Sequence, residues 1–385
     1  MVELCKSYDC MACGACYNIC TKSAISMELN EEGFKYPQIN DGLCVECGLC
    51  RKVCPILNPM EKHPKTESPL AVISKSEELR RKSSSGGMFS LLASWVLRNK
   101  GVVYGAVFND RYEVYHCSAE TEEELSKQRG SKYAQSDTKD TYKQVKKQLK
   151  EGRFVLYTGT PCQVAGLYSY LGKNNLETLW TVDLVCHGVP SVKSFQIYLK
   201  KLAEKKKITI ENIKNFRFRE LERWGYAPSF RLGDKNYKLL PEENLYMRLF
   251  LSNRILRLSC YNCRFTTPER IGDITVADFW GIGNNKPYKY DTQKGCSLVL
   301  LNTEKGRGLF AKISTELDWE ERSWGEALKT NTQLHRQSVC PKDRAEAFYS
   351  LYNNDYDVTY NRFFNTPYLR LRRSVGKILK TLHLR

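Results

Sequence analysis

Two runs of four cysteines carry the clearest chemical signal in this chain. In both runs, two, two and three residues separate successive thiols, and the residues are Cys10, Cys13, Cys16, Cys20, Cys44, Cys47, Cys50 and Cys54. This spacing is typical of domains that hold two 4Fe–4S clusters, in which the fourth cysteine of each run binds the other run's cluster. One cluster is therefore expected on Cys10, Cys13, Cys16 and Cys54, and the other on Cys44, Cys47, Cys50 and Cys20.

Zinc is the alternative occupant for such thiols. Zinc sites usually pair C-x2-C units across a longer gap, whereas here closely spaced thiols occur in fours. Gly14 and Gly48 lie inside the two runs, where the backbone must fold tightly around a cluster. The pattern favours iron–sulfur clusters, which move single electrons. It leaves Cys5 without an assigned role.

More cysteines lie where the rest of the chain is expected to build a sheet edge. A Thr-Pro pair, typical of a helix start, precedes Cys162, so the helix dipole should favour the thiolate of Cys162. Cys186 ends a predicted strand, and ligands of open α/β sheets bind at the C-terminal ends of strands. Both thiols should thus open onto one edge. Cys260 and Cys263 form a C-x2-C pair, which brings the number of these thiols to four, enough for a third cluster.

Small residues form several turns that suit a phosphate. "SSSGG" at 83–87 precedes a predicted helix over 88–98, "GSKY" covers 130–133, and "TGT" covers 158–160. Free N–H groups at such turns and helix starts can bind phosphate or pyrophosphate, although Ser-Gly stretches are usually plain loops. The candidate cofactor-binding residues are Ser84, Ser85, Gly86, Gly87, Ser131, Lys132, Thr158, Gly159 and Thr160.

Three polar residues flank predicted strand ends. His187 is a candidate proton donor to a substrate, against the commoner case of a histidine that bonds a loop backbone. Asp273 and Asp278, in "GDITVADFW", either position a cofactor or terminate the strand.

The elements that must position these residues alternate between strands and helices. Strand, helix and strand follow one another over 154–186, which predicts a βαβ unit and hence a parallel pair in a sheet. Hairpins are expected around Asn109-Asp110 and Gly233-Asp234. The expected fold class is α+β or α/β, with a small dicluster ferredoxin-like head before an α/β body with a mixed sheet. The expected domains are 1–60 (the head), 68–147 and 150–330 (the body), and 331–385 (a basic C-terminal extension), with a proline-rich linker at 55–68.

Composition limits the classes of function and partner. Sixteen cysteines with no apparent signal peptide indicate metal or redox chemistry in a reducing cytoplasm. No run reaches the roughly 18 apolar residues of a membrane span. The net charge of +17 favours acidic partners, but the basic run at 200–207 lacks interleaved aromatic residues, so no nucleic-acid partner is expected. Residues 368–385 predict a basic amphipathic helix, which lies either on the inner membrane face or on the body or a partner protein.

Seven motifs, in order along the chain, resemble one known family. They are "SSSGGMFSLLA", "GVVYGAVF", "GSKYAQS", "LYTGTPCQVAGL", "VDLVCHGVPS", "CYNCRF" and "GDITVADFWGI". The sequence is similar to the coenzyme F-420 hydrogenase/dehydrogenase β-subunit family, fused to an N-terminal dicluster ferredoxin domain. The resemblance implies a flavoprotein body with FAD held by the three small-residue turns. It also implies a third 4Fe–4S cluster on Cys162, Cys186, Cys260 and Cys263.

Two functions remain open under this resemblance. The first is an FAD- and iron–sulfur-dependent oxidoreductase whose two-electron partner is a small molecule such as a deazaflavin. The second is a non-catalytic electron-transfer or docking subunit that feeds a separate enzyme. In either case, the expected protein partner is a ferredoxin or a hydrogenase or dehydrogenase subunit. Some similar chains are encoded among genes for surface-polysaccharide metabolism.

Overall fold

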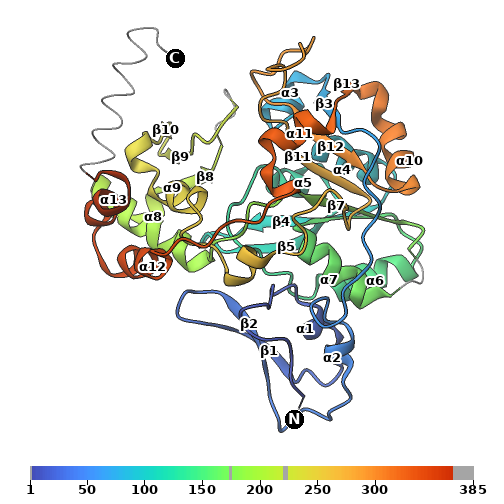
Figure 1. Ribbon diagram of the computed structural model, residues 1–385, viewed down its shortest axis with the longest axis horizontal. Helices are drawn as coiled ribbons and strands as arrows, with labels where there is room; N and C mark the ends of the chain where they lie inside the picture. The colour runs from blue at the N-terminus through green and yellow to red at the C-terminus, as the bar shows by residue number, and fades with distance from the viewer. Residues whose placement is uncertain (1, 173–175, 220–223, 367–385) are drawn as a thin grey trace.

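The computed structural model describes residues 2–172, 176–219 and 224–366. In Figure 1 a small N-terminal head lies below a larger body, and the C-terminal helices lie at one side of that body. No helix within the described ranges is long and apolar enough to span a bilayer. The basic helix predicted at 368–385 lies outside the described residues.

An eight-stranded sheet forms the centre of the body, in the order β13-β3-β12-β11-β7-β6-β4-β5. The strands β3, β4, β6, β7 and β11 run parallel to one another, and β5, β12 and β13 run antiparallel to their neighbours. The mixed sheet predicted for the body is thus confirmed. The strand bounds are β3 (Leu70–Ser74), β4 (Val102–Phe108), β5 (Val114–Ala119), β6 (Val155–Gly159), β7 (Leu179–Leu184), β11 (Ile274–Asp278), β12 (Ser297–Leu301) and β13 (Leu317–Glu321).

Helices cover both faces of this sheet. Successive strand residues point to opposite faces of the sheet. Because helices cover both faces, the central strands carry apolar side chains on each of them. On one face, α4, α5 and α10 form a core with strand residues such as Val103 and Leu156. On the other face, α6 and α7 pack on Val102 and Val155, and α11 packs near β3 and β12. The helix bounds are α4 (Met88–Arg98), α5 (Glu122–Gln128), α6 (Thr141–Lys150), α7 (Pro161–Leu171), α10 (Glu304–Ile313) and α11 (Trp324–Thr330).

Several local predictions are confirmed. The helix expected over 88–98 is α4. The predicted βαβ unit is β6-α7-β7, with Val155 opposite Leu179 in a parallel pair. The hairpin expected around Asn109-Asp110 joins β4 to β5.

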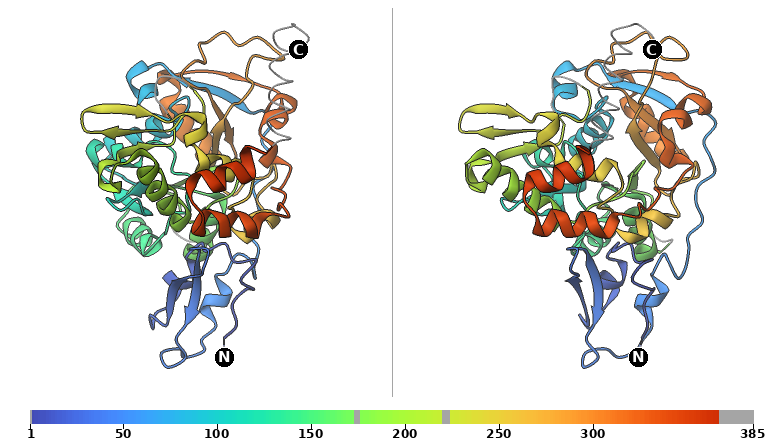
Figure 2. Two further views of the ribbon diagram at one scale, coloured as in Figure 1. Left: turned by 90° about the vertical axis from the view of Figure 1, so that its left-hand side faces the viewer. Right: turned by 60° about the vertical axis from the view of Figure 1, so that its left-hand side comes forward.

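A second core, rich in aromatic residues, lies beside the sheet. It contains side chains from the head and from helices that are far apart in sequence, and α12 and α13 pack on α8. Figure 2 shows the red C-terminal helices α12 and α13 on the front of the body. The elements around this second core are α8 (Val192–Lys206), β8 (Lys214–Arg217), β9 (Ser229–Leu232), β10 (Lys235–Lys238), α9 (Leu245–Leu251), α12 (Arg344–Asn353) and α13 (Tyr356–Phe364).

The head contains a β-hairpin whose tip inserts into that second core. Phe34, at the tip, is only 1% exposed and packs edge-on against Phe348 at 6.2 Å between ring centroids. Glu32 accepts two hydrogen bonds of 2.7 Å from the Arg344 guanidinium. The head is therefore docked on the body by buried contacts. Its elements are α1 (Ala15–Ile19), β1 (Ile25–Leu29), β2 (Lys35–Ile39) and α2 (Leu49–Lys52).

Short helices complete the described chain. The proline-rich stretch 55–68 connects head and body without a helix or strand, and His63 N donates to Arg270 O at 2.7 Å. The short helices are α3 (Glu77–Arg81), η1 (Ile210–Asn212), η2 (Pro241–Glu243), η3 (Leu258–Asn262), η4 (Ser314–Glu316) and η5 (Thr332–Leu334).

Candidate functional site

The C-terminal ends of the five parallel strands meet at one edge of the sheet (Figure 1). Ligands of open α/β sheets bind at such an edge. The loop 83–87 lies between β3 and α4, the turn 158–160 joins β6 to α7, and Cys186 follows β7 by two residues. The motifs that the sequence singled out are thus assembled along one edge.

Four half-buried thiols lie close together at this edge. Cys162 is in the first turn of α7, Cys186 follows β7, Cys260 lies in η3, and Cys263 follows η3 directly. Burial raises the pKa of Cys186 well above its usual value, and the charges of the other three thiols raise it further. Such mutual effects require the groups to be near one another. The structure therefore brings together the four thiols grouped by the sequence.

Burial decides the acidity of these thiols. The sequence predicted that the start of α7 would favour the Cys162 thiolate, but burial raises its pKa to about 11. The Thr160 hydroxyl, 3.1 Å from Cys162 Sγ, opposes this shift without overcoming it. In the metal-free thiol, loss of solvation thus outweighs the effect of the helix start. A bound metal would hold these thiols as thiolates at neutral pH.

The head thiols lie close enough to act on one another's pKa. Burial and the charges of Cys10 and Cys54 raise the pKa of Cys16 to about 12. Cys13 is fully buried beside the same thiols. In the second group, burial and the charges of Cys47 and Cys20 raise the pKa of Cys50, and Cys44 lies on the loop that leads to Cys47.

Cys5, which had no assigned role, lies against the first head group. Its hydrogen bonds lower the pKa of Cys10 and Cys54 to about 6 and raise the pKa of Cys5 itself. This contact was not predicted, because the spacing of Cys5 does not fit either run.

One helix connects a head group to the body group. A Cβ placed on Gly166 of α7 would lie 2.9 Å from Cys13 Cβ and 3.0 Å from Cys13 Sγ. Cys162 precedes Gly166 by about one helical turn, a rise of about 6 Å at 1.5 Å per residue. The Tyr142 hydroxyl, 2.5 Å from Cys13 O and 2.7 Å from Gln163 O, joins the same two elements. The glycine within "QVAGLY" was a missed signal, because a mid-helix glycine often marks a close approach.

Two of the predicted phosphate turns touch. Ser84 Oγ accepts a 2.8 Å hydrogen bond from Ser131 N, which joins the loop 83–87 to the turn 130–133. Gly87 caps α4 with φ +91° and offers no side chain to the first N–H groups of that helix. Gly86 packs so tightly that a Cβ would lie 2.1 Å from Val72 O. This helix start can accept an anion.

The remaining predicted cofactor residues bond within the protein. Lys132 donates from Nζ to the carbonyls of residues 127, 128 and 129 at the end of α5, and burial lowers its pKa to about 7. Thr158 donates to Tyr104 O, and Thr160 forms a capping box with Gln163. Gly159 lies against Gln163, and Ser85 donates to Cys296 O.

An aromatic cluster that the sequence did not reveal lies next to these turns. The rings of Trp224 and Trp280 stack at 4.6 Å with an interplanar angle of 9°. Asp278, at the end of β11, accepts a 2.7 Å bond from Arg219, which is 6% exposed and has a buried Nη2 without a partner. Gly295 connects this cluster to the loop 83–87, since its Cβ would lie 3.3 Å from Trp224. The cluster thus offers flat aromatic surfaces and a partly unpaired cation.

His187 and Asp273 are held by structural contacts. Gln333 donates to His187 Nδ1 at 3.1 Å, burial lowers the pKa of His187, and its ring packs edge-on against Phe250 at 4.9 Å. Asp273 precedes β11 at the opposite edge of the sheet and accepts from Thr181 N at 2.9 Å and from Thr303 Oγ1 at 2.7 Å.

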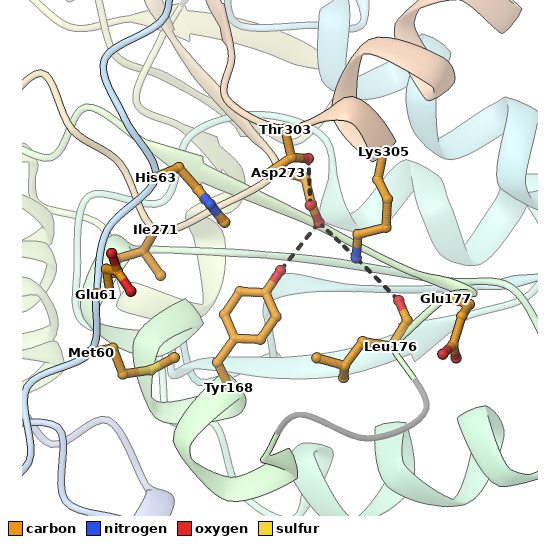
Figure 3. Close-up of a pocket in the computed structure, with 10 residues that line it drawn as sticks. All are labelled: Met60, Glu61, His63, Tyr168, Leu176, Glu177, Ile271, Asp273, Thr303 and Lys305. Atoms are coloured by element: carbon orange, nitrogen blue, oxygen red, sulfur yellow. Dashed lines mark hydrogen bonds and ion pairs between the residues drawn. The ribbon is translucent and has the colours of Figure 1, made fainter.

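A cavity of about 390 Å³ lies at that opposite edge (Figure 3). In Figure 3 Asp273 lies between the Tyr168 hydroxyl and the Lys305 ammonium. Four of its polar side chains already bond within the group, and they are Asp273, Tyr168, Thr303 and Lys305.

Among the described residues, no three or more His, Cys, Asp or Glu side chains converge on a point where a single metal ion could bind. In a 4Fe–4S cluster each thiolate binds a different iron, so its ligands need not converge on one point.

Family models match three consecutive parts of the chain. Residues 9–57 match the 4Fe-4S dicluster domain. Residues 70–142 match the N-terminal part, and residues 152–324 the C-terminal part, of the coenzyme F-420 hydrogenase/dehydrogenase β subunit. The chain belongs to this family. The expected family and the expected dicluster head are confirmed, and an iron–sulfur oxidoreductase function in electron transfer follows.

Other comparisons add little to this family assignment. Among solved structures, a chain of the F-420-reducing nickel–iron hydrogenase complex from Methanosarcina barkeri matches with a TM-score of 0.48 and 16% identity. The match covers 80% of this chain and 96% of that chain. No curated protein matches.

Proposed function

We propose that this protein is an iron–sulfur flavoprotein that passes electrons between the head and a two-electron partner. The observation that carries the proposal is the contact of Cys13 with Gly166, one turn from Cys162. It brings a head thiol group and the body thiol group to opposite ends of one helical turn. Electrons could therefore pass from head to body without any domain movement.

The proposal assigns three 4Fe–4S clusters to the thiols. The two head clusters use the ligands expected from the spacing. The body cluster uses Cys162, Cys186, Cys260 and Cys263, which are half-buried and close together. This donor set fits a cluster, because thiolates are the usual ligands of iron–sulfur centres.

FAD is the proposed cofactor beside the body cluster. The uncapped start of α4 and the touching turns at Ser84 and Ser131 suit its pyrophosphate. The Trp224–Trp280 stack suits a planar ring, and the buried Arg219 suits an anionic group. When bound, FAD exchanges single electrons with clusters and pairs of electrons with a substrate. The proposed location is the cytoplasm, where thiols stay reduced.

Anaerobic purification of the full chain tests the assignment. About twelve irons per chain are expected, four for each of three clusters, together with bound FAD. Cys260→Ser should lower the iron content by about four, while Cys340→Ser, at an exposed cysteine, should change nothing. About eight irons in the unaltered chain would contradict the third cluster.

A panel of redox partners then separates the two candidate functions. Reduced ferredoxin, NAD(P)H and reduced F-420 are offered in turn, and bleaching of the flavin is recorded. Turnover with a small two-electron partner supports an oxidoreductase. Exchange with protein partners alone supports a subunit that feeds electrons to a separate enzyme.

A further inference from the structure

Arg257 lies between the head thiols and the body thiols. Its side chain is 1% exposed, and its Nε donates to Cys10 O at 2.7 Å. Its carbonyl accepts from Cys260 N at 3.0 Å. One residue thus contacts a proposed ligand of the first head cluster and a proposed ligand of the body cluster.

The charge of Arg257 has no carboxylate partner in the described chain. Nη1 donates to Gln135 Oε1 at 3.2 Å, Nη2 is buried without any partner, and the guanidinium lies 4.1 Å from the centre of the Tyr36 ring. These neighbours are all uncharged.

The other buried arginines of the described chain differ in this respect. Each of them forms an ion pair with at least one aspartate or glutamate, and they are Arg219, Arg270, Arg322 and Arg344. Burying an unpaired ion is strongly unfavourable. The lone buried cation between two thiol groups therefore indicates that its counter-charge belongs to those groups.

The electrostatics agree with this position. The charge of Arg257 lowers the pKa of Cys10, and it opposes the effect of burial on the pKa of Cys162 and Cys260. The charge of Arg257 thus lies near thiols of both groups.

We propose that Arg257 is the shared counter-charge of the two clusters that flank it, raising the reduction potential of both. The inference rests on the proposed body cluster. A cluster with four thiolate ligands is anionic and gains one more negative charge when it accepts an electron. A nearby buried cation stabilises that reduced form, and it also reduces the repulsion between the two anionic clusters.

Redox titrations of the full chain, followed by electron paramagnetic resonance, test the proposal. Arg257→Gln should make reduction of the two flanking clusters at least tenfold less favourable, a downward shift of about 59 mV or more. The cluster on Cys20, Cys44, Cys47 and Cys50 should keep its potential and serves as the internal reference. Arg257→Lys, which keeps the charge, should leave both potentials close to those of the unaltered chain.

Arg264→Gln is the matched control. Arg264 is exposed and lowers the pKa of Cys54. Because water and salt screen an exposed charge, its removal should change the equilibrium constants for reduction less than tenfold. If Arg257→Gln fails to load its clusters, Gln135→Glu neutralises Arg257 in place and should lower the same two potentials.

The outcomes separate the two proposals. Twelve irons with unchanged potentials in Arg257→Gln overturn the role of Arg257 and leave the proposed function standing. Equal shifts in the Gln and Lys variants also overturn it, because they would show an effect of shape and not of charge. About eight irons in the unaltered chain overturn the third cluster, and the shared role with it.

Discussion

The contact between Gly166 and the head yields a sharp prediction about stability. Alanine normally stabilises a helix interior relative to glycine by about 1 kcal/mol. In Gly166→Ala, however, the new methyl would lie 2.9 Å from Cys13 Cβ and 2.9 Å from the Tyr142 hydroxyl. Overpacking of this kind costs about 1–3 kcal/mol. The net result is a loss of up to about 2 kcal/mol, with the head displaced from α7.

Gly308→Ala is the matched control for this substitution. Gly308 lies in α10, and nothing lies within 4 Å of its added Cβ, so the full gain of about 1 kcal/mol is expected. Anaerobic urea unfolding measures both variants. Stopped-flow reduction then measures how fast electrons that enter the head reach the proposed body cluster, and only Gly166→Ala should slow this step. If Gly166→Ala were as stable as Gly308→Ala and transferred electrons at the normal rate, the close head–body contact would be refuted.

Three further predictions follow from other contacts. Phe34→Ala should weaken docking of the head by about 3–5 kcal/mol, seen as faster hydrogen exchange in the hairpin, whereas Leu29→Ala, at a site 62% exposed, should not. Asp183→Asn leaves Arg270 as an unpaired buried cation, so unfolding should require about 3–5 kcal/mol less free energy. Burial lowers the pKa of His116 from 6.5 to about 4. The contribution of the neutral His116 ring to the free energy of unfolding is therefore complete above pH 6.5 and is lost as the pH falls toward 4. That loss is on the order of 3 kcal/mol, and it should be absent in His116→Gln when urea unfolding is followed against pH. A flat pH profile for the unaltered chain would contradict the burial of a neutral imidazole.

Features set by local sequence were predictable. The bounds of α4 follow from apolar residues that recur at helical spacing between a glycine pair and the predicted end of the helix. The order β6-α7-β7 follows from alternating strand and helix patterns. The head clusters were predictable for the same reason, because their ligands lie within short, regular runs.

Features that depend on distant residues were not predictable. Nothing local joins Cys162 to Cys263, which lie 101 positions apart, so their grouping relied on the count of spare cysteines and on the family resemblance. Arg257 resembles any other arginine in the sequence, and only its burial without a carboxylate sets it apart. The effect of burial on the pKa of the metal-free Cys162 thiol was not predictable for a related reason, because burial is a property of the whole fold.

The docking of the hairpin tip has a consequence for the order of events during protein synthesis. Arg344, which holds Glu32, is separated from it by 312 residues, and Tyr352 donates to Glu32 O across 320 residues. Domains generally fold as the chain emerges, N-terminal parts first. The head can therefore acquire its iron and sulfide long before the ribosome has made the helix that anchors it. Until then the head has no connection to the body, so electrons that reach the head cannot pass to the thiols at the start of α7.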